Sequence, residues 1–354
     1  MSADSETMDP ETVRDLLIET VSIPSVSGDE RDAAEHLVGF FENQGREAWL
    51  DPVGNVRAPG DDSVLLTSHV DTVPGEIPVR VEREDGTEML WGRGAVDATG
   101  PLCAMAVAAV ETGASFVGVV GEETDSRGAR YLVEDREVPD AVVNGEPSGA
   151  DGITLGYRGM LSGRYGVQTA SAHTSRPEPN AIQRAMAWWG RIEESVATDP
   201  EGPVFESVTA KPVGVEGGVA DDGLAVEATI DAGFRIPPSS SADELRAAVE
   251  NELAEGEIEW NDPIPPTMQS PRTPLARAFR VAIRAEGGDP RLLRKTGTSD
   301  MNVYAGTWDR PMVTYGPGDS ALDHAPEERL DLAEYDRSIA VLRRVCTELC
   351  GESQ

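Results

Sequence analysis

The chain has 354 residues, and its 64 acidic side chains outnumber its 30 basic ones, which gives a formal net charge of −34. Such an acidic surface repels phosphate and argues against a general nucleic-acid-binding protein. No apolar run approaches the roughly 20 residues that span a bilayer, and the acidic first ten residues lack a targeting signal. We therefore expect a soluble, cytoplasmic protein of one large or two ordinary domains.

The basic residues are almost all arginine, because Lys211 and Lys295 are the only lysines. An acid-rich, lysine-poor composition resembles that of cytosolic proteins from extreme halophiles such as haloarchaea, in which hydrated carboxylates keep the surface soluble at high salt. An ordinary acidic protein is the alternative. Cys103, Cys346 and Cys350 form no disulfide pattern, and we interpret them as structural.

The first 155 residues alternate predicted helices with short apolar strands. Asp9-Pro10 predicts a helix start, and a second helix begins near Asp29. Further helices are predicted after Pro101 and from near Ser126. The predicted buried strands are Val64–Ser68, Phe116–Val120 and Ala141–Asn144. This alternation predicts an α/β domain with a largely parallel central sheet.

After Gly156 the pattern changes to that of a small α+β insert. Its predicted strands are Leu161–Thr169 and Ala225–Phe234, and its predicted helices are Asn180–Val196 and Ser241–Leu253. The prolines at 263, 265 and 266 predict a linker back to the first domain. Helices from about Leu275 and Leu330, with a strand at Met312–Tyr315, would complete that domain. We therefore predict a domain of residues 1–155 and 266–354 with an insert at 156–265.

Acidic residues and histidines follow the predicted strands of the first domain. His69 and Asp71 come after the first strand, and their shared direction suits a metal-binding imidazole held by a carboxylate. Glu122 and Glu123 follow the second strand, and Glu146 follows the third. Because ligands bind at the carboxyl ends of strands in such sheets, we expect these side chains to meet at one edge.

Two loops add Asp97, in Gly92–Asp97, and His324, in Leu322–Glu327. Two imidazoles and three carboxylates suit two Zn²⁺-like ions that share one carboxylate. Adjacent carboxylates such as Glu122 and Glu123 can supply one ligand and one general base. Each motif alone has a surface alternative, but the whole set argues against scattered surface acids.

In order and spacing, these five segments resemble the co-catalytic zinc amidohydrolase and peptidase family, which includes acetylornithine deacetylase and succinyl-diaminopimelate desuccinylase. The resemblance covers nearly the whole chain. It implies a zinc-peptidase-like α/β/α catalytic domain with an inserted α+β lid and dimerisation domain. It implies two Zn²⁺ per subunit, for which Co²⁺ can substitute. His69 and Glu146 would bind one ion, Glu123 and His324 would bind the other, and Asp97 would bridge them.

The resemblance also implies roles around the metals. Asp71 would orient His69, and Glu122 would be the general base. In the insert, His173 matches a histidine that reaches the active site of a partner subunit, so a homodimer is implied. Arg235 matches an arginine that binds the substrate carboxylate. A surface histidine and a structural arginine are the alternatives for these two residues.

A narrower resemblance lies in Arg294–Asn302 and Tyr315–Ser320. These segments resemble the family members that release lysine or ornithine from an acidic amino-group carrier protein, in lysine and arginine biosynthesis. There the α-amino group of the amino acid is amide-bonded to the γ-carboxyl of the carrier's terminal glutamate. The candidate substrate-binding residues are Arg235, Lys295, Arg176 and Thr298. A surface charge is the alternative for Lys295.

Two other functions stay open. One is a deacylase of small N-acyl amino acids, such as acetylornithine or succinyl-diaminopimelate. The other is a catalytically silent relative that only binds, although a silent relative would not need Glu122. An acidic carrier would also need a local positive region on so acidic a protein. The candidates for that region are Arg158, Arg176, Arg235, Arg291, Arg294 and Lys295.

Overall fold

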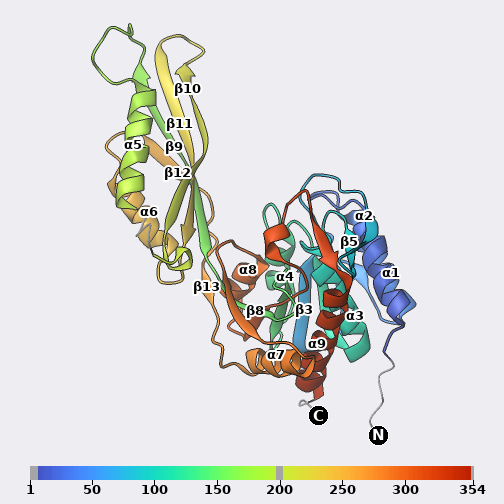
Figure 1. Cartoon of the computed structure of the whole chain (residues 1–354). Helices are drawn as coiled ribbons and strands as arrows, with labels where there is room; N and C mark the ends of the chain where they lie inside the picture. The colour runs from blue at the N-terminus through green and yellow to red at the C-terminus, as the bar shows by residue number, and fades with distance from the viewer. Residues whose placement is uncertain (1–6, 197–201, 352–354) are drawn as a thin grey trace. The chain divides into compact units, whose positions relative to one another are not determined.

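The computed structural model describes residues 7–196 and 202–351, and the chain forms two compact units (Figure 1). The first unit comprises residues 1–155, 269–293 and 303–354, and the second comprises residues 156–268 and 294–302. The chain passes from one unit to the other between Leu155 and Gly156, where the sequence pattern changes. Of the acidic N-terminal segment, residues 1–6 lie outside the described part.

The segment 294–302 differs from the sequence-based expectation, which placed it in the first domain. It is held within the second unit by hydrogen bonds around Arg158. The Arg158 Nε donates to the Thr296 carbonyl at 2.9 Å. The side-chain amide of Asn302 donates to the carbonyls of Arg158 at 3.2 Å and Pro265 at 2.8 Å. These contacts join segments that are far apart in the sequence. The local sequence pattern therefore could not predict that segment 294–302 belongs to the second unit.

The largest sheet has nine strands, in the order β1-β2-β6-β3-β7-β15-β8-β13, with β14 pairing to β8. The strands are β1 (Trp49–Leu50), β2 (Val56–Ala58), β3 (Asp61–His69), β6 (Ala114–Val119), β7 (Val142–Gly145), β8 (Gly152–Tyr157), β13 (Thr267–Met268), β14 (Arg291–Lys295) and β15 (Met312–Thr314). β3 runs parallel to β6 and β7, and β15 runs parallel to β7. The predicted parallel centre is therefore confirmed, and its strands end at one edge of the sheet.

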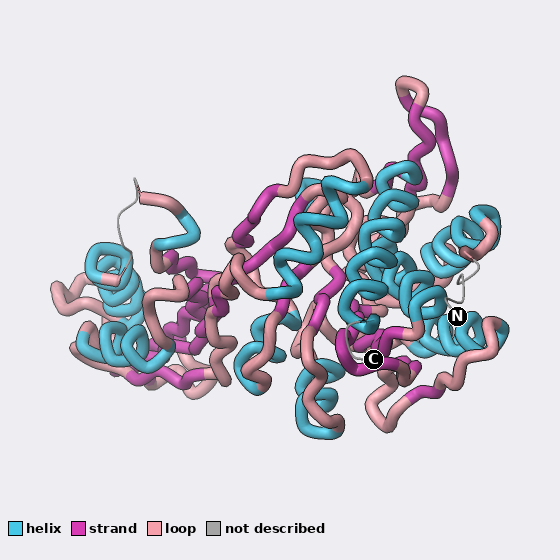
Figure 2. The backbone as a smooth tube through the Cα atoms, turned by 90° about the horizontal axis from the view of Figure 1, so that it is seen from below, coloured by secondary structure: helices cyan, strands magenta, loops and turns pink. Residues whose placement is uncertain are grey.

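Helices surround this sheet (cyan in Figure 2). They are α1 (Pro10–Val21), α2 (Arg31–Asn43), α3 (Thr99–Thr112), α4 (Arg127–Asp135), α7 (Pro274–Ala285), α8 (Asp300–Thr307) and α9 (Leu332–Gly351). Asp9 caps α1, and Thr273 caps α7, each followed by a proline that fits the first helical position. α3 is apolar on every side and is buried against α1, α9 and β3. No helix of the described residues is long and apolar enough to cross a membrane.

A three-stranded sheet brings two distant loops together. It has the order β16-β5-β4 and consists of β4 (Arg80–Glu84), β5 (Thr87–Trp91) and β16 (Arg329–Asp331). The hairpin β4–β5 was not predicted. β16 pairs antiparallel to β5, with Arg329 opposite Trp91. The segment after His324 therefore lies beside the start of the glycine-rich loop that carries Asp97.

The second unit has a four-stranded antiparallel sheet in the order β10-β11-β9-β12. Its elements are β9 (Gly159–Ala170), α5 (Ala181–Ser195), β10 (Thr209–Val219), β11 (Ala225–Ile236), α6 (Ala242–Asn251) and β12 (Glu257–Trp260). Asn180 and Ser241 begin α5 and α6 with capping boxes. The two helices pack on the sheet through a core in which Trp188 stacks on Tyr165 at 4.1 Å. The two helices and the antiparallel sheet agree with the α+β insert that the sequence predicts.

Candidate active site

His69 is the last residue of β3, and its two ring nitrogens face different partners. Nδ1 lies 2.8 Å from the main-chain oxygen of Asp71, whereas the nearest carboxylate oxygen of Asp71 lies 3.7 Å away. Nε2 lies 3.2 Å from Oδ1 of Asp97. When Nδ1 carries the proton and donates it to the Asp71 carbonyl, the lone pair of Nε2 remains available to bind a metal ion.

The carboxylate of Asp71 holds the turn that carries the two glutamates. It accepts hydrogen bonds from the backbone amides of Glu122 and Glu123, each at 3.1 Å, and from the Ser27 hydroxyl at 2.7 Å. Burial favours a higher pKa for Asp71, but the bonds with His69, Ser27 and the Glu123 amide outweigh it and hold the pKa at about 2. Asp71 thus contacts Nδ1 of His69 through its main-chain oxygen and, at 3.7 Å, through its carboxylate, and the same carboxylate also holds the amides of Glu122 and Glu123.

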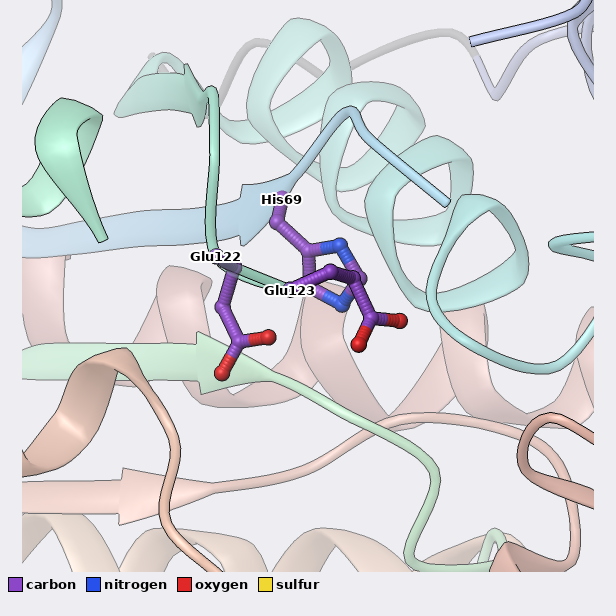
Figure 3. A group of neighbouring side chains, drawn as sticks. All are labelled: His69, Glu122 and Glu123. Carbon is purple, nitrogen blue, oxygen red and sulfur yellow. The ribbon is translucent and has the colours of Figure 1, made fainter. Parts of the chain in front are cut away.

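Glu122 and Glu123 lie beside His69 on the segment that follows β6 (Figure 3). One potential ligand atom from each of the three residues lies within 4.8 Å of the others. Glu123 also reaches the loop from the far end of the chain, because its Oε1 lies 3.0 Å from Nε2 of His324. The two adjacent carboxylates thus share one site but have different neighbours.

Asp97 lies between the two imidazoles. Its Oδ1 is 3.2 Å from Nε2 of His69, and its Oδ2 is 3.1 Å from Nε2 of His324. Asp97 therefore belongs to two groups of potential metal ligands: His69, Asp97 and Glu146, and Asp97, Glu123 and His324. Within each group the ligand atoms lie within 4.8 Å of one another. The structure brings all five predicted ligands together, with one carboxylate common to both groups.

The loop before α3 requires glycine where it turns toward Asp97. Gly94 has a φ of +83°, in the left-handed region. A Cβ atom at this position would lie 2.7 Å from Oγ1 of Thr99 and 2.8 Å from Cγ2 of Thr72. The conformation and the close contacts both exclude a larger residue, so Gly94 lets this loop pack against the segment after β3.

The electrostatics of the cluster favour a cation. The hydrogen bond with Asp97 raises the pKa of His324 to about 9, although partial burial opposes this. Burial would lower the pKa of His69, but its bonds with Asp71 and Asp97 raise it well above its usual value. Burial raises the pKa of Glu123. Imidazole nitrogens and carboxylate oxygens are the donors that Zn²⁺ accepts, so the donor set fits two divalent cations that share Asp97.

Two residues beside this cluster, Arg93 and Glu328, were not predicted from the sequence. Glu328 is fully buried and forms an ion pair with Arg93, with 2.7 Å between Nη1 and Oε2. Burial raises the pKa of Glu328, whereas the amides of Asp97 and Val96 and the charge of Arg93 oppose the rise. Arg93 lies inside the glycine-rich motif, and Glu328 directly follows the predicted His324 motif. Only the pairing of β5 with β16 shows that the two side chains meet.

The predicted substrate-binding residues all belong to the second unit. Arg235, on β11, donates to the Thr298 hydroxyl at 3.2 Å. Within the described residues no carboxylate forms a salt bridge with Arg235, and burial lowers its pKa. Most arginines of this acidic chain do pair with carboxylates. Arg235 and Thr298 are therefore a half-buried pair that can bind an anionic group, and Lys295 ends β14, which pairs with β8.

His173 and Arg176 lie in the exposed loop between β9 and α5. Nδ1 of His173 is 2.8 Å from the Ser175 hydroxyl, and the Arg176 amide donates to the His173 carbonyl at 3.0 Å. Among the described residues, the hydrogen-bond partners of His173 and Arg176 lie in the same loop. The structure therefore joins Arg235 to Thr298 but does not bring His173 or Arg176 to them.

Two of the expected positive residues have other roles. Arg158 is buried, and its guanidinium donates to the carbonyls of Thr296, Val204 and Ser207, so it does not contribute an exposed charge. Arg294 pairs with Glu206 at 3.0 Å, which offsets its charge. The expected positive region is thus smaller than the sequence indicated.

Comparison with known proteins places this geometry in a family. The model of peptidase family M20/M25/M40 matches residues 65–348. LysW-lysine hydrolase from Deinococcus radiodurans is 41% identical over 367 residues, covering 98% of this chain and 99% of that protein. LysW-lysine/LysW-ornithine hydrolase from Sulfurisphaera tokodaii is 31% identical and covers 96% of each chain.

Solved structures show the same fold. A tripeptidase from Staphylococcus aureus has a TM-score of 0.80 at 20% identity, over 98% of this chain and 100% of its own. The YXEP protein of Bacillus subtilis, described as a dinuclear metal-binding peptidase, has a TM-score of 0.69 at 14% identity, over 97% and 98%. The α/β architecture with its inserted segment is therefore confirmed. The match over most of its length and the similarity to full-length relatives show that the chain belongs to peptidase family M20/M25/M40, a family of metal-dependent hydrolases.

Proposed function

We propose that this protein is a di-zinc amide hydrolase that releases lysine, ornithine or both from the γ-carboxyl of the terminal glutamate of an amino-group carrier protein. The observation that carries the proposal is the position of Asp97, which lies within 3.2 Å of His69 and 3.1 Å of His324. One shared carboxylate between two ligand groups is the arrangement that two catalytic ions need. The names of two relatives that match 98% and 96% of the chain support the substrate.

In this proposal each group of ligands holds one ion. His69 and Glu146 would hold the first, Glu123 and His324 would hold the second, and Asp97 would be shared by both. Zn²⁺ suits the mixture of nitrogen and oxygen donors, and Co²⁺ is a substitute with similar preferences. Bound divalent cations would polarise the amide carbonyl and lower the pKa of water toward neutrality.

Glu122 is the proposed general base. It lies beside His69 in the same cluster as Glu123, and the Asp71 carboxylate fixes its backbone amide. Its carboxylate would take the proton of the attacking water and return it to the nitrogen of the departing amine as the amide bond breaks. Glu123 is the ligand of the pair in this proposal, because it contacts His324.

The second unit would supply substrate contacts. Arg235, with Thr298 beside it, would bind the carboxylate of the substrate, and Lys295 and Arg176 would add positive charge. His173 would act in the active site of a partner subunit in a homodimer, where it would stabilise the negative oxygen of the tetrahedral species. His173 is exposed, and its hydrogen bonds to other described residues stay within its own loop, which supports a contact made outside that loop.

The dimer proposal has a direct test. Glu122→Gln and His173→Ala variants, each inactive alone, should recover part of the activity when they form verified heterodimers. In a heterodimer, one of the two composite sites would then carry both residues intact. Heterodimers that remain inactive would exclude a shared site.

We place the reaction in lysine and arginine biosynthesis in the cytoplasm, since the product is a free basic amino acid. We also propose a halophilic source, which the charge of −34 and the scarcity of lysine support. The proposal of a halophilic source rests on composition alone.

The substrate is tested by direct comparison. Purified, metal-loaded protein is assayed with carrier-linked lysine, carrier-linked ornithine, N-acetylornithine and N-succinyl-diaminopimelate. We expect kcat/KM to be highest for a carrier-linked substrate. A higher value for either small substrate would show a small-molecule deacylase, and no turnover of any of the four by protein that retains its metals would favour a silent binding relative.

A further inference from the structure

Arg93 and Glu328 form a buried ion pair next to the ligand groups. Their side chains are 15% and 0% exposed, and 2.7 Å separates Nη1 from Oε2. Neither residue belongs to a group of potential metal ligands. A buried ion pair loses much of its Coulomb energy to desolvation, so stability alone is a weak reason for it. Its contacts indicate another role.

The second oxygen of Glu328 binds the main chain at Asp97. Oε1 accepts hydrogen bonds from the amides of Val96 at 2.9 Å and Asp97 at 3.0 Å. Hydrogen bonds to a charged acceptor are stronger than neutral ones. Glu328 therefore fixes the backbone from which the carboxylate shared by the two ligand groups extends.

Arg93 connects the same point to the two loops that carry the histidines. Its Nε donates to the carbonyl of Gly75 at 3.0 Å, in the segment that follows His69. Its Nη1 also donates to the carbonyl of Ala325 at 3.3 Å, directly after His324. One guanidinium and one carboxylate thus join the loops of His69, Asp97 and His324.

We propose that the Arg93–Glu328 pair is a positioning element that sets the spacing of Asp97 from the two imidazoles. The proposal rests on the proposed function only in taking the two ligand groups as metal sites. Without the pair, all five ligands would remain, but the three loops would lose their common anchor. Partners that orient metal ligands typically change metal affinity by about 10- to 100-fold.

The test compares Glu328→Gln and Arg93→Met with a matched control, Glu111→Gln. Glu111 is likewise a buried carboxylate that accepts from an arginine, Arg343 at 2.7 Å, and from a backbone amide, that of Met8 at 2.8 Å. It lies in the last turn of α3, about 18 Å along the helix from its first residue. The control therefore repeats the chemistry of the pair at a distance from the ligands.

Three quantities are measured for each variant: the affinity for Zn²⁺ by competition with a chromophoric chelator, the visible spectrum of the Co²⁺-loaded protein, and the melting temperature of the metal-free protein. We expect Glu328→Gln and Arg93→Met to weaken Zn²⁺ binding by at least 10-fold and to alter the Co²⁺ spectrum. We expect Glu111→Gln to lower the melting temperature with metal affinity within 2-fold of wild type.

Wild-type affinity and spectrum in the folded Glu328→Gln and Arg93→Met variants would overturn the proposal. An equal loss of affinity in Glu111→Gln would overturn it too, because the effect would then follow general stability. If Glu328→Gln does not fold, Arg93→Met decides, since it leaves the bonds of Glu328 to the two amides in place. Failure of the wild type itself to bind metal would instead reject the proposed function.

Discussion

At the scale of single residues, the two adjacent glutamates carry different proposed roles. Glu122→Gln keeps the size of the side chain and removes its ability to accept a proton. We expect the variant to retain both metals and to lose about 10²- to 10⁴-fold in turnover, the usual contribution of a general base. Metal analysis and kcat on the same preparation check this, with Glu134→Gln, at an exposed position of α4, as the control.

Normal turnover by Glu122→Gln, or loss of a metal ion from it, would contradict the assignment. Glu123→Gln should behave in the opposite way and lose metal, because Glu123 is the glutamate in contact with His324. The two variants together separate the base from the ligand.

The grouping of the five candidate ligands could be predicted because each one follows an apolar strand or lies in or after a glycine-rich loop, which are local features of the sequence. Glu328 could not be predicted in the same way. In a chain with 64 acidic residues, one more glutamate after Glu327 carries no local signal. Its role arises from contacts with Arg93 and the Asp97 loop, which are more than 200 positions away along the chain.

At the scale of elements, the segment 294–302 depends on Arg158. The Arg158 side chain donates to the carbonyls of Thr296, Val204 and Ser207, and it is 5% exposed. Ser207 is buried, whereas Thr296 and Val204 are exposed and their carbonyls can bond to water instead. Arg158→Met would leave the buried Ser207 carbonyl without its donor, and we expect a loss of about 1–3 kcal/mol in the free energy of unfolding, measured by urea denaturation.

Arg164→Met is the matched control for this prediction. Arg164 lies on β9, in the same unit, and pairs with Asp231 at 2.9 Å, but both side chains are well exposed. An exposed pair contributes about 0.2–1 kcal/mol at most. Equal losses for the two variants would show that Arg158 does not hold the segment.

Helices and strands with strong periodicity were predicted to within a few residues. α1, α5 and α6 have capping residues that mark their starts, and the buried parallel strands are short apolar runs. The hairpin β4–β5 was missed because all of its residues except the buried Leu90 are half-buried or exposed, so it lacks a long apolar run. Its pairing with β16 is a tertiary contact, so the way in which the Asp97 and His324 loops are joined became visible only in the structure.

At the scale of the whole molecule, the net charge of −34 predicts a strong dependence on salt. Repulsion among the carboxylates destabilises the compact state at low ionic strength. The Debye length falls from about 10 Å at 0.1 M salt to about 3 Å at 1 M. We therefore expect the melting temperature to rise with KCl concentration and to level off near 1 M.

Calorimetry between 0.05 and 3 M KCl checks this expectation. A flat or falling melting temperature would contradict the halophilic interpretation of the composition. A rise that continues without levelling off would indicate exclusion of salt from the surface rather than screening of charge.

The central claim is that two ions sharing Asp97 catalyse hydrolysis of the carrier-linked amide. The most direct measurement titrates metal-free protein with Zn²⁺ and records bound ions and turnover of carrier-linked lysine in the same samples. We predict two ions bound per chain, with full turnover reached only at the second equivalent, and no turnover in Asp97→Ala. Full turnover with one ion, or turnover that persists in metal-free protein, would contradict the claim.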